Sequence, residues 1–490
     1  MTCLSDSQME NIGLRYILDK LNTCTPYGTE LAGKLKPFRP NEKVLLIEEL
    51  DNIGKIRDTY NVADYSKIFR ILSQFKDIRP SIQKCSSPEY VLNEVELFEL
   101  KNFLLSLEEL IEVLEILQKE LHHEFCLTCN LPGGMPQALA LLDPEGTRLR
   151  SFYIPDTATA KLTEIRTEKR RLEAAIITSD NEENKRLLLD KRLLTVCAEE
   201  DEELAIRRKL TAEIFSYAND FLSNTSAIGK LDLLLQKGRL AAEYKTTRPA
   251  ISESEVSFDN VYNPYIEHLL KNNGKEYCPL SIILRKGTAI LTGANMGGKS
   301  VSLKTLTLNI LLFQMGFFVF AEKAVLPLFD FVHLISEDLQ SLDMGLSTFA
   351  AEVVKLNQII NDLEQGFSFV ALDEFARGTN PQEGAALVRA VANYLNNENA
   401  VSILSTHYDN VASHEFNNYQ VIGLKNLNID SLMQTQFSQN MIRKDENPAA
   451  LIAQYMDYRL EKSFGDAGPP KDAINICKLL NLSDKIIELL

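Results

Sequence analysis

The chain has 490 residues, of which 45% are hydrophobic and 24% charged, and these proportions are usual for a globular protein of about three domains. Its formal net charge of −16 excludes a protein that coats nucleic acid through general basicity. A local basic surface stays possible, because affinity for phosphate depends on where the cations lie.

The cysteines and the N-terminus indicate the compartment. The eight cysteines are scattered, and a chain of this length builds a large core without disulfides, so we expect reduced thiols. Residues 1–13 contain neither the basic nor the apolar region of a signal peptide. The most apolar stretch, 306–321, contains polar residues and is too short to span a bilayer. We therefore expect a cytoplasmic protein with no membrane-spanning segment.

The first half of the chain is predicted to be mostly helical. Apolar residues recur at spacings of three and four from 94 to 121, which indicates one long helix with a single apolar face. The sequence Pro-Gly-Gly at 132–134 ends this pattern. The apolar runs 138–142 and 147–154 flank the turn sequence Asp-Pro-Glu-Gly, which predicts a short β-hairpin.

A second long helical stretch is predicted from about 157 to 246. Its first part mixes both charge signs, and five acids follow one another at 199–203. This mixture is typical of an exposed helical arm or an antiparallel coiled coil, although a solvated helix face is the more usual explanation of any single charge. Arg248 and Pro249, followed by the polar residues 251–255, mark a domain boundary.

Beyond residue 256, short apolar runs alternate with helical segments. The predicted buried strands are 288–293, 367–374 and 400–407, and the predicted helices are 298–315, 347–363 and 383–397. This alternation predicts an α/β domain with a largely parallel sheet, so the expected fold class is α plus α/β. The expected domains are a helical core (1–155), lever helices (156–250), the α/β domain (251–440) and a C-terminal helical segment (441–490).

A phosphate-binding loop is predicted at 293–300. These residues fit the pattern G-x-x-x-x-G-K-S, with a predicted strand before and a predicted helix after them. Glycines allow backbone N–H groups to surround phosphate oxygens, and the helix N-terminus favours negative charge. Lys299 supplies a charge for the β- and γ-phosphates, and Ser300 offers a hydroxyl to Mg²⁺. A chance glycine-rich turn is the alternative, but the strand and helix favour ATP binding with Mg²⁺.

Two acids support the nucleotide site independently. Asp373 and Glu374 end a predicted strand, where an ordinary strand that ends in acids is the alternative. Asp373 is suited to hold Mg²⁺, and Glu374 to orient or deprotonate the attacking water. His407 ends the next strand and is suited to sense the γ-phosphate, although a histidine at a strand end is more often only hydrogen bonded.

Two further groups of residues have open interpretations. His122, His123, Cys126 and Cys129 lie within eight residues and could hold Zn²⁺, but no second Cys-x-x-Cys follows, and buried or incidental thiols are the alternative. Tyr277 precedes the strand of the phosphate loop and could stack on adenine, although a packed surface tyrosine is an equal alternative.

Four motifs together resemble the MutS family of ABC-class ATPases. TGANMGGKS at 292–300 resembles the phosphate loop of that family, with Ala294 where proline is usual. MGLSTFAAE at 344–352 resembles its signature segment, and LDEFARGTNPQEG at 372–384 resembles its Walker B motif and D-loop. STHY at 405–408 matches its switch-histidine motif. The four motifs occur in the family's order.

The resemblance implies roles for particular residues of this chain. The nucleotide-binding residues would be Gly293, Asn295, Met296, Gly297, Gly298, Lys299, Ser300 and Val301. Ser300 and Asp373 would hold Mg²⁺, and Glu374, His407 and Lys299 would be catalytic. Ser347 would reach the nucleotide of a partner subunit, so the resemblance implies two composite sites across a homodimer or heterodimer.

The resemblance extends beyond the α/β domain. Residues 21–38 resemble the start of the MutS core, and 141–166 resemble the lever region of the MutS2 branch. The same branch is echoed at 337–349 and 378–387. Residues 462–490 resemble the small helical dimerisation segment that follows the ATPase domain in this family.

Differences between this sequence and the DNA-repair members of the family favour a protein over DNA as the expected client. The core begins almost at residue 1, which leaves no room for a mismatch-reading domain, and the sequence stops before a nuclease-like tail. The acidic run 199–203 lies where a DNA clamp should be basic. Asn263 and Leu346 also differ from the residues usual in repair proteins.

This layout resembles the ATPase component of the reactivase for cobalamin-dependent lysine 5,6-aminomutase. The expected function is thus a dimeric ATP-driven switch that remodels a protein client, with a cobalamin aminomutase and a second reactivase subunit as expected partners. The alternative is a DNA-binding ATPase that acts on branched or mismatched DNA. A structural scaffold without ATPase activity is disfavoured, because the residues of the phosphate loop and Walker B motif are intact.

Overall fold

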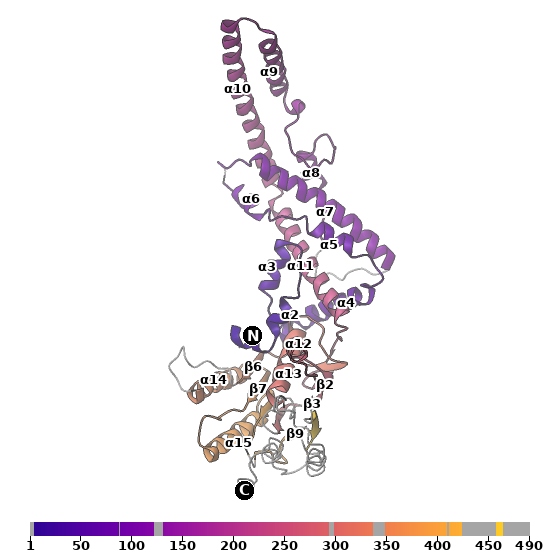
Figure 1. The fold of residues 1–490 in the computed structure, drawn as a ribbon, viewed down its shortest axis with the longest axis vertical. Helices are drawn as coiled ribbons and strands as arrows, with labels where there is room; N and C mark the ends of the chain where they lie inside the picture. Colours follow the sequence, from indigo (N-terminus) through magenta and orange to yellow (C-terminus); the bar gives the residue numbers. More distant parts are fainter. Residues whose placement is uncertain are drawn as a thin grey trace, which may run out of the picture. The chain divides into compact units, whose positions relative to one another are not determined.

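The chain forms two compact units. The computed structural model describes residues 4–87, 89–121, 131–293, 298–336, 348–408, 411–423 and 457–463 (Figure 1). One unit, here called the sheet unit, comprises Met1–Asn22, Leu35–Asp58 and Lys237–Leu490. The other, here called the helical unit, comprises Thr23–Lys34 and Thr59–Gln236. The first helices of the chain therefore group with its C-terminal part.

The helical unit follows the predicted pattern in most places. Its helices are α3 (Pro26–Gly33), α5 (Ser66–Leu72), α6 (Arg79–Lys84), α7 (Glu94–Leu121), α8 (Pro136–Leu142), α9 (Ala160–Thr178), α10 (Glu182–Phe215) and most of α11 (Ala218–Glu243), with a short 3₁₀ turn η2 at Asp156–Ala158. α7 coincides with the predicted long helix, and the leucines of its apolar face are buried. The N-terminal helical region is therefore confirmed.

The predicted β-hairpin is wrong. Residues 136–142 form α8, and 147–154 form no strand. Proline in the first turn is preorganised for a helix, and the apolar residues of α8 bury on one side. The carboxylate of Asp143 accepts hydrogen bonds from Arg148 N at 2.7 Å and from buried Lys101 Nζ at 3.0 Å. The segment after α8 is therefore held by hydrogen bonds to the Asp143 side chain, and not by the backbone pairing of a β-hairpin.

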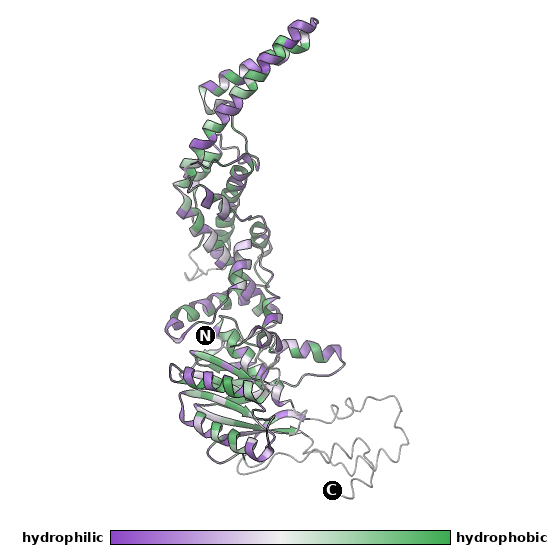
Figure 2. Ribbon diagram, turned by 90° about the vertical axis from the view of Figure 1, so that its left-hand side faces the viewer, coloured by the Kyte–Doolittle hydropathy of each residue, from purple (hydrophilic) through white to green (hydrophobic). Residues whose placement is uncertain are grey.

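The predicted arm is an antiparallel hairpin of α9 and α10 (Figure 1). Hydrophilic and hydrophobic residues are interspersed along this arm (Figure 2). Arg166 pairs with Glu199 at 3.0 Å and with Glu203 at 2.8 Å, and Arg192 pairs with Glu173 at 2.8 Å. Lys161 of α9 also pairs with Glu202 at 2.8 Å, so three of the five acids at 199–203 pair with cations of α9, while Glu200 and Asp201 are exposed.

The sheet unit contains two sheets. The six-stranded sheet has the order β10 (Asp457–Lys462), β9 (Asn417–Gly423), β4 (Gly287–Thr292), β8 (Ala400–Ser405), β7 (Ser368–Asp373) and β6 (Phe331–Ile335). The four-stranded sheet has the order β1 (Ala250–Ile251), β5 (Lys323–Leu326), β2 (Val256–Val261) and β3 (Leu280–Leu284). Strands β9 to β6 are parallel, so the predicted α/β domain with a largely parallel sheet is confirmed.

The sheet unit also contains α-helices. They are α1 (Asp6–Asn11), α2 (Leu14–Leu18), α4 (Lys43–Thr59, after the short η1 at Pro40–Glu42), α12 (Pro264–Asn272), α13 (Lys299–Gln314), α14 (Thr348–Leu363) and α15 (Pro381–Asn397). Apolar residues of β7 and β8 form one core with α14 and α15. α13 contacts β6, β7 and β8, and it is buried along nearly its whole length. No helix within the described ranges is long and apolar enough to cross a membrane.

The C-terminal segment differs from its prediction at 457–462. These residues form β10, which pairs antiparallel with β9, with Leu460 opposite Val421. Tyr458 and Leu460 alternate with the charged Arg459 and Glu461, a period of two that suits a strand. Pairing also satisfies the backbone groups at the edge of the sheet. The remaining residues of this segment lie outside the described part of the chain.

A buried histidine makes the stability of the sheet unit depend on pH. His333 lies in β6 with Nε2 3.3 Å from Asp362 Oδ2, and burial lowers its pKa from 6.5 to about 4. Between these values the unfolded chain binds a proton that the folded chain does not, so the free energy of unfolding decreases as pH falls through this window. The loss approaches about 3 kcal/mol at its acid end.

We expect His333→Gln to remove the part of the pH dependence of the unfolding free energy that is due to His333. Chemical unfolding followed by circular dichroism at pH 7 and pH 5 measures it, because only the wild type should lose the histidine contribution on acidification. Equal losses of stability in both proteins would contradict the assignment to His333.

Candidate nucleotide site

The topology brings the predicted site residues to one edge of the sheet. β4 pairs parallel with β8, and β8 pairs parallel with β7. The carboxyl ends of these neighbouring strands therefore lie together, and ligands of open α/β sheets bind at this edge. The phosphate loop follows β4, Asp373 ends β7 with Glu374 directly after it, and His407 follows β8.

Lys299 is buried at the start of α13. Gly298 before it is left-handed with φ 85°, which suits glycine because no Cβ opposes it. Lys299 Nζ donates a hydrogen bond to Gly293 O at 2.8 Å and lies 3.3 Å from Glu374 Oε1. A buried ammonium needs such partners, so Lys299 is held beside the Walker B acid.

Asp373 is buried and is hydrogen bonded to two serine hydroxyl groups. Ser405 Oγ donates to Asp373 Oδ1 at 2.6 Å, and the Ser300 hydroxyl is also hydrogen bonded to this carboxyl. Burial raises the pKa of Asp373, and the neighbouring Glu374 raises it further. Carboxylate and hydroxyl oxygens are hard donors, so Ser300 and Asp373 fit the predicted Mg²⁺ site.

Asp373 and Ser300 supply only two ligands, so Mg²⁺ at this site would take its other ligands from phosphate oxygens and water. Within the described ranges, no group of three or more His, Cys, Asp or Glu side chains is arranged to hold a metal ion. Mg²⁺ in nucleotide sites is usually held by one or two carboxylates together with phosphate oxygens and water, so one carboxylate and one hydroxyl suffice.

Glu374 lies among three cationic or titratable side chains. It is 9% exposed, and its backbone is left-handed with φ 48°. Besides Lys299, its carboxylate lies 3.4 Å from Arg377 Nη1 and 3.6 Å from His407 Nδ1. Its backbone N–H donates to Ser405 Oγ at 3.0 Å. The carboxylate is thus fixed at the edge where β4 and β7 end.

His407 faces Glu374 without a hydrogen bond to it. The 3.6 Å separation is too long, and Nδ1 is buried with no hydrogen-bond partner among the described residues. The side chain is 33% exposed, and its ring lies 4.5 Å from that of Tyr408. This geometry is compatible with the predicted phosphate sensor, which stays a prediction.

The structure thus brings together five predicted residues, which are Lys299, Ser300, Asp373, Glu374 and His407. Val301 lies in the first turn of α13. Three nucleotide-binding residues (Asn295, Met296 and Gly297), the predicted trans-acting Ser347 and the four metal candidates (His122, His123, Cys126 and Cys129) lie outside the described residues.

Tyr277 makes contacts with the phosphate-loop helix. Its hydroxyl lies 3.0 Å from Thr305 Oγ1 of α13 and accepts a hydrogen bond from Asn263 N at 3.2 Å. Burial raises the pKa of Tyr277 to about 12. These contacts explain the position of the hydroxyl, and the predicted stacking on adenine stays a prediction.

Sequence reasoning missed two residues of the site. Arg377 lies three residues after Glu374, and Ser405 begins the motif from which only His407 was assigned. Ser405 connects the two acids, because it donates to Asp373 and accepts from Glu374 N. The signal for Ser405 was its position at the end of the strand next to β7.

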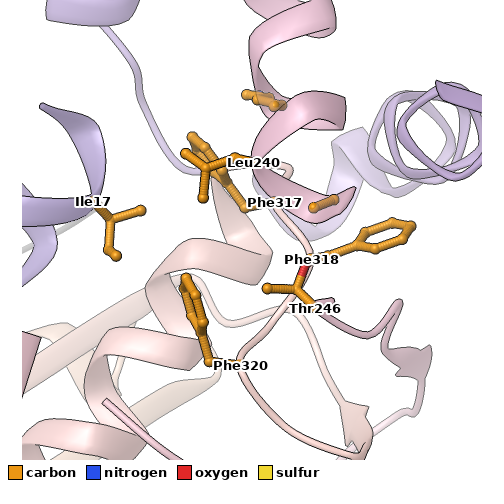
Figure 3. Close-up of a pocket in the computed structure, with 8 residues that line it drawn as sticks. Ile17, Leu240, Thr246, Phe317, Phe318 and Phe320 are labelled. Carbon is orange, nitrogen blue, oxygen red and sulfur yellow. The ribbon is translucent and has the colours of Figure 1, made fainter. Parts of the chain in front are cut away.

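A small hollow elsewhere in the sheet unit does not suit a nucleotide. Phe317, Phe318 and Phe320 surround Thr246 there (Figure 3), and Lys237 and Leu240 also line it. Its volume is about 10 Å³, room for one water molecule at most. Thr246 Oγ1 is buried there without a hydrogen-bond partner among the described residues, which suits a single buried water.

Part of the sheet unit matches a known family of domains. The family model for MutS domain V matches residues 289–465, which include all the site residues that the structure brings together. MutS domain V is an ATPase domain, so this chain carries an ATPase domain of the MutS family, and ATP binding follows from it. The predicted ATPase activity is therefore confirmed at the level of the domain.

Proteins named endonuclease MutS2 are distant relatives. The one from Levilactobacillus brevis is 32% identical over 231 residues, which are 46% of this chain and 28% of that protein. Those from Pediococcus pentosaceus and Acetivibrio thermocellus are 32% and 30% identical over 49% and 42% of this chain, and over 30% and 26% of their own lengths. The chain spans less than a third of these curated relatives. None of the three is named a reactivase, so that narrower prediction gains no support.

Proposed function

We propose that this protein is an ATP-driven switch in which Glu374 activates the water that attacks ATP. The observation that supports this most directly is the cluster of Lys299, Asp373 and Glu374 at the carboxyl ends of β4 and β7. In this proposal Lys299 binds the terminal phosphates, which compete with Glu374 for its ammonium group. Ser300 and Asp373 hold Mg²⁺, which neutralises phosphate charge when bound.

The proposed active form is a dimer. ATPase domains of this family generally dimerise, and no feature of the described chain selects a homodimer over a heterodimer. In the proposal, ATP closes the dimer around two composite sites, with Ser347 reaching the partner's nucleotide as the family resemblance implies. Hydrolysis reopens the dimer, and the lever helices transmit this change to a bound client.

We propose a protein as the client. α9 carries five cations and three acids, and α10 carries seven cations and nine acids, so the hairpin as a whole has twelve of each. Affinity for a nucleic-acid backbone depends on an excess of cations, so a neutral arm favours a protein surface. Three of the five acids at 199–203 pair with α9, so the run by itself is only a weak argument against DNA. A cobalamin aminomutase is the narrower form of this proposal.

DNA is the second candidate client, because the relatives are named endonuclease MutS2. ATP turnover of the purified protein, measured with and without duplex, mismatched and branched DNA, distinguishes the two. We expect turnover that DNA does not change and that is absent from Lys299→Ala. Stimulation by DNA that declines with added salt would contradict the protein client and support the DNA-processing function. Wild-type turnover no greater than that of Lys299→Ala would contradict the ATPase itself.

A further inference from the structure

The backbone after β7 is held in an unusual conformation. Glu374 and Ala376 are both left-handed, with φ 48° and 63°. Residues with a Cβ rarely adopt this conformation, and it persists only where surrounding contacts enforce it. The direction of the Glu374 side chain therefore depends on what holds this turn.

Two buried side chains hold the turn at Ala376. Glu352 Oε2, on α14, accepts a hydrogen bond from Ala376 N at 3.0 Å. Tyr408 Oη, after β8, donates to Ala376 O at 2.8 Å. Glu352 and Tyr408 are each 8% exposed. Both backbone polar groups of Ala376 are thus fixed by side chains from separate elements.

A glycine on α15 leaves room for this arrangement. A Cβ at Gly384 would collide with Tyr408 Oη and would approach Ala376 O to 3.1 Å. The missing side chain therefore lets the tyrosine hydroxyl reach the turn. Residues from α14, from the segment after β8 and from α15 therefore all meet at Ala376.

The buried carboxyl of Glu352 contributes little to the stability of the folded protein. It is buried, and its hydrogen bond to Ala376 N is its single polar contact among the described residues. Burial raises the pKa of Glu352. An isolated buried carboxyl usually costs more than an apolar side chain of similar size, so a role in holding the turn explains its presence better than a role in folding.

We propose that Glu352 and Tyr408 are positioning residues for ATP hydrolysis, which hold Ala376 and thereby direct Glu374 toward the phosphate site. The inference rests on the proposed function, because it acts through Glu374. It adds two residues that do not touch the substrate. Each would affect the chemical step without affecting nucleotide affinity.

Steady-state hydrolysis and nucleotide binding test the inference. We expect Glu352→Ala and Tyr408→Phe to lower kcat by about 10- to 100-fold, because small misplacements of a catalytic group cost this much. The Kd for a fluorescent ATP analogue should change by less than about twofold. Glu352→Gln should recover most of the loss, since its amide oxygen can accept the bond from Ala376 N. Gln358→Ala, at an exposed position of the same helix, is the matched control.

A double-mutant cycle separates positioning from a structural role. In a Glu374→Gln background, Glu352→Ala should cause no further loss of kcat, because its effect passes through Glu374. Independent losses in the double variant, or unchanged kcat in both single variants, would overturn the inference. Normal hydrolysis by Glu374→Gln alone, or no hydrolysis by the wild type, would instead overturn the proposed function.

Discussion

Replacing Glu374 with glutamine should lower kcat for ATP hydrolysis by about 100- to 10,000-fold, the range expected on loss of a general base. Glutamine has nearly the same shape but cannot accept the proton of the attacking water. The Glu374 carboxylate lies 3.3 Å from Lys299 Nζ and is 9% exposed, so it is fixed beside the predicted phosphate position. Phosphate release under saturating ATP and Mg²⁺ measures the effect.

The same variant should still bind ATP. Because closure of the proposed dimer precedes hydrolysis, Glu374→Gln should accumulate a dimer in ATP that size-exclusion chromatography with light scattering detects. Glu364→Gln, at an exposed acid just after α14, is the matched control and should hydrolyse normally. Normal turnover by Glu374→Gln would show that another group activates the water.

Replacing Lys299 with alanine should weaken ATP binding by about 100-fold or more. Charge-assisted contacts to phosphate are among the strong interactions of a nucleotide site, and Lys299 is the buried cation at the start of α13. Titration with a fluorescent ATP analogue measures the loss. Lys323→Ala, at an exposed position of β5, controls for removal of a lysine as such.

Lys299→Ala is also expected to affect the stability of the fold. Lys299 is a close cation partner of the buried Glu374 carboxylate, so its removal leaves that charge with less compensation. Circular dichroism must therefore show that Lys299→Ala is folded before its affinity is compared. A folded variant that binds ATP as tightly as the wild type would refute the assigned role of Lys299.

Comparison of prediction and structure shows where local pattern suffices. The strands and helices around the phosphate loop were predicted to within a few residues, because each is a contiguous run with its own periodicity. The helix Glu94–Leu121 was predicted for the same reason. The errors at 138–154 and 457–462 concern segments whose structure depends on partners far along the chain.

The sequence by itself determined the chemistry of this protein. A phosphate loop is one continuous strand, turn and helix, and the Walker B acids end one strand, so composition and spacing identify them without knowledge of the fold. These local patterns led to the ATPase domain and to the predicted Mg²⁺-binding oxygens of Ser300 and Asp373.

Only the tertiary structure decided how these groups are oriented. Ser405 joins Asp373 to Glu374 N, and Glu352 and Tyr408 hold Ala376, through contacts between residues 24 to 32 positions apart. The pairing of Glu199 and Glu203 with Arg166 of α9 likewise depends on the hairpin. Such contacts leave no periodic trace in the sequence, because they depend on which elements pack together and in which register.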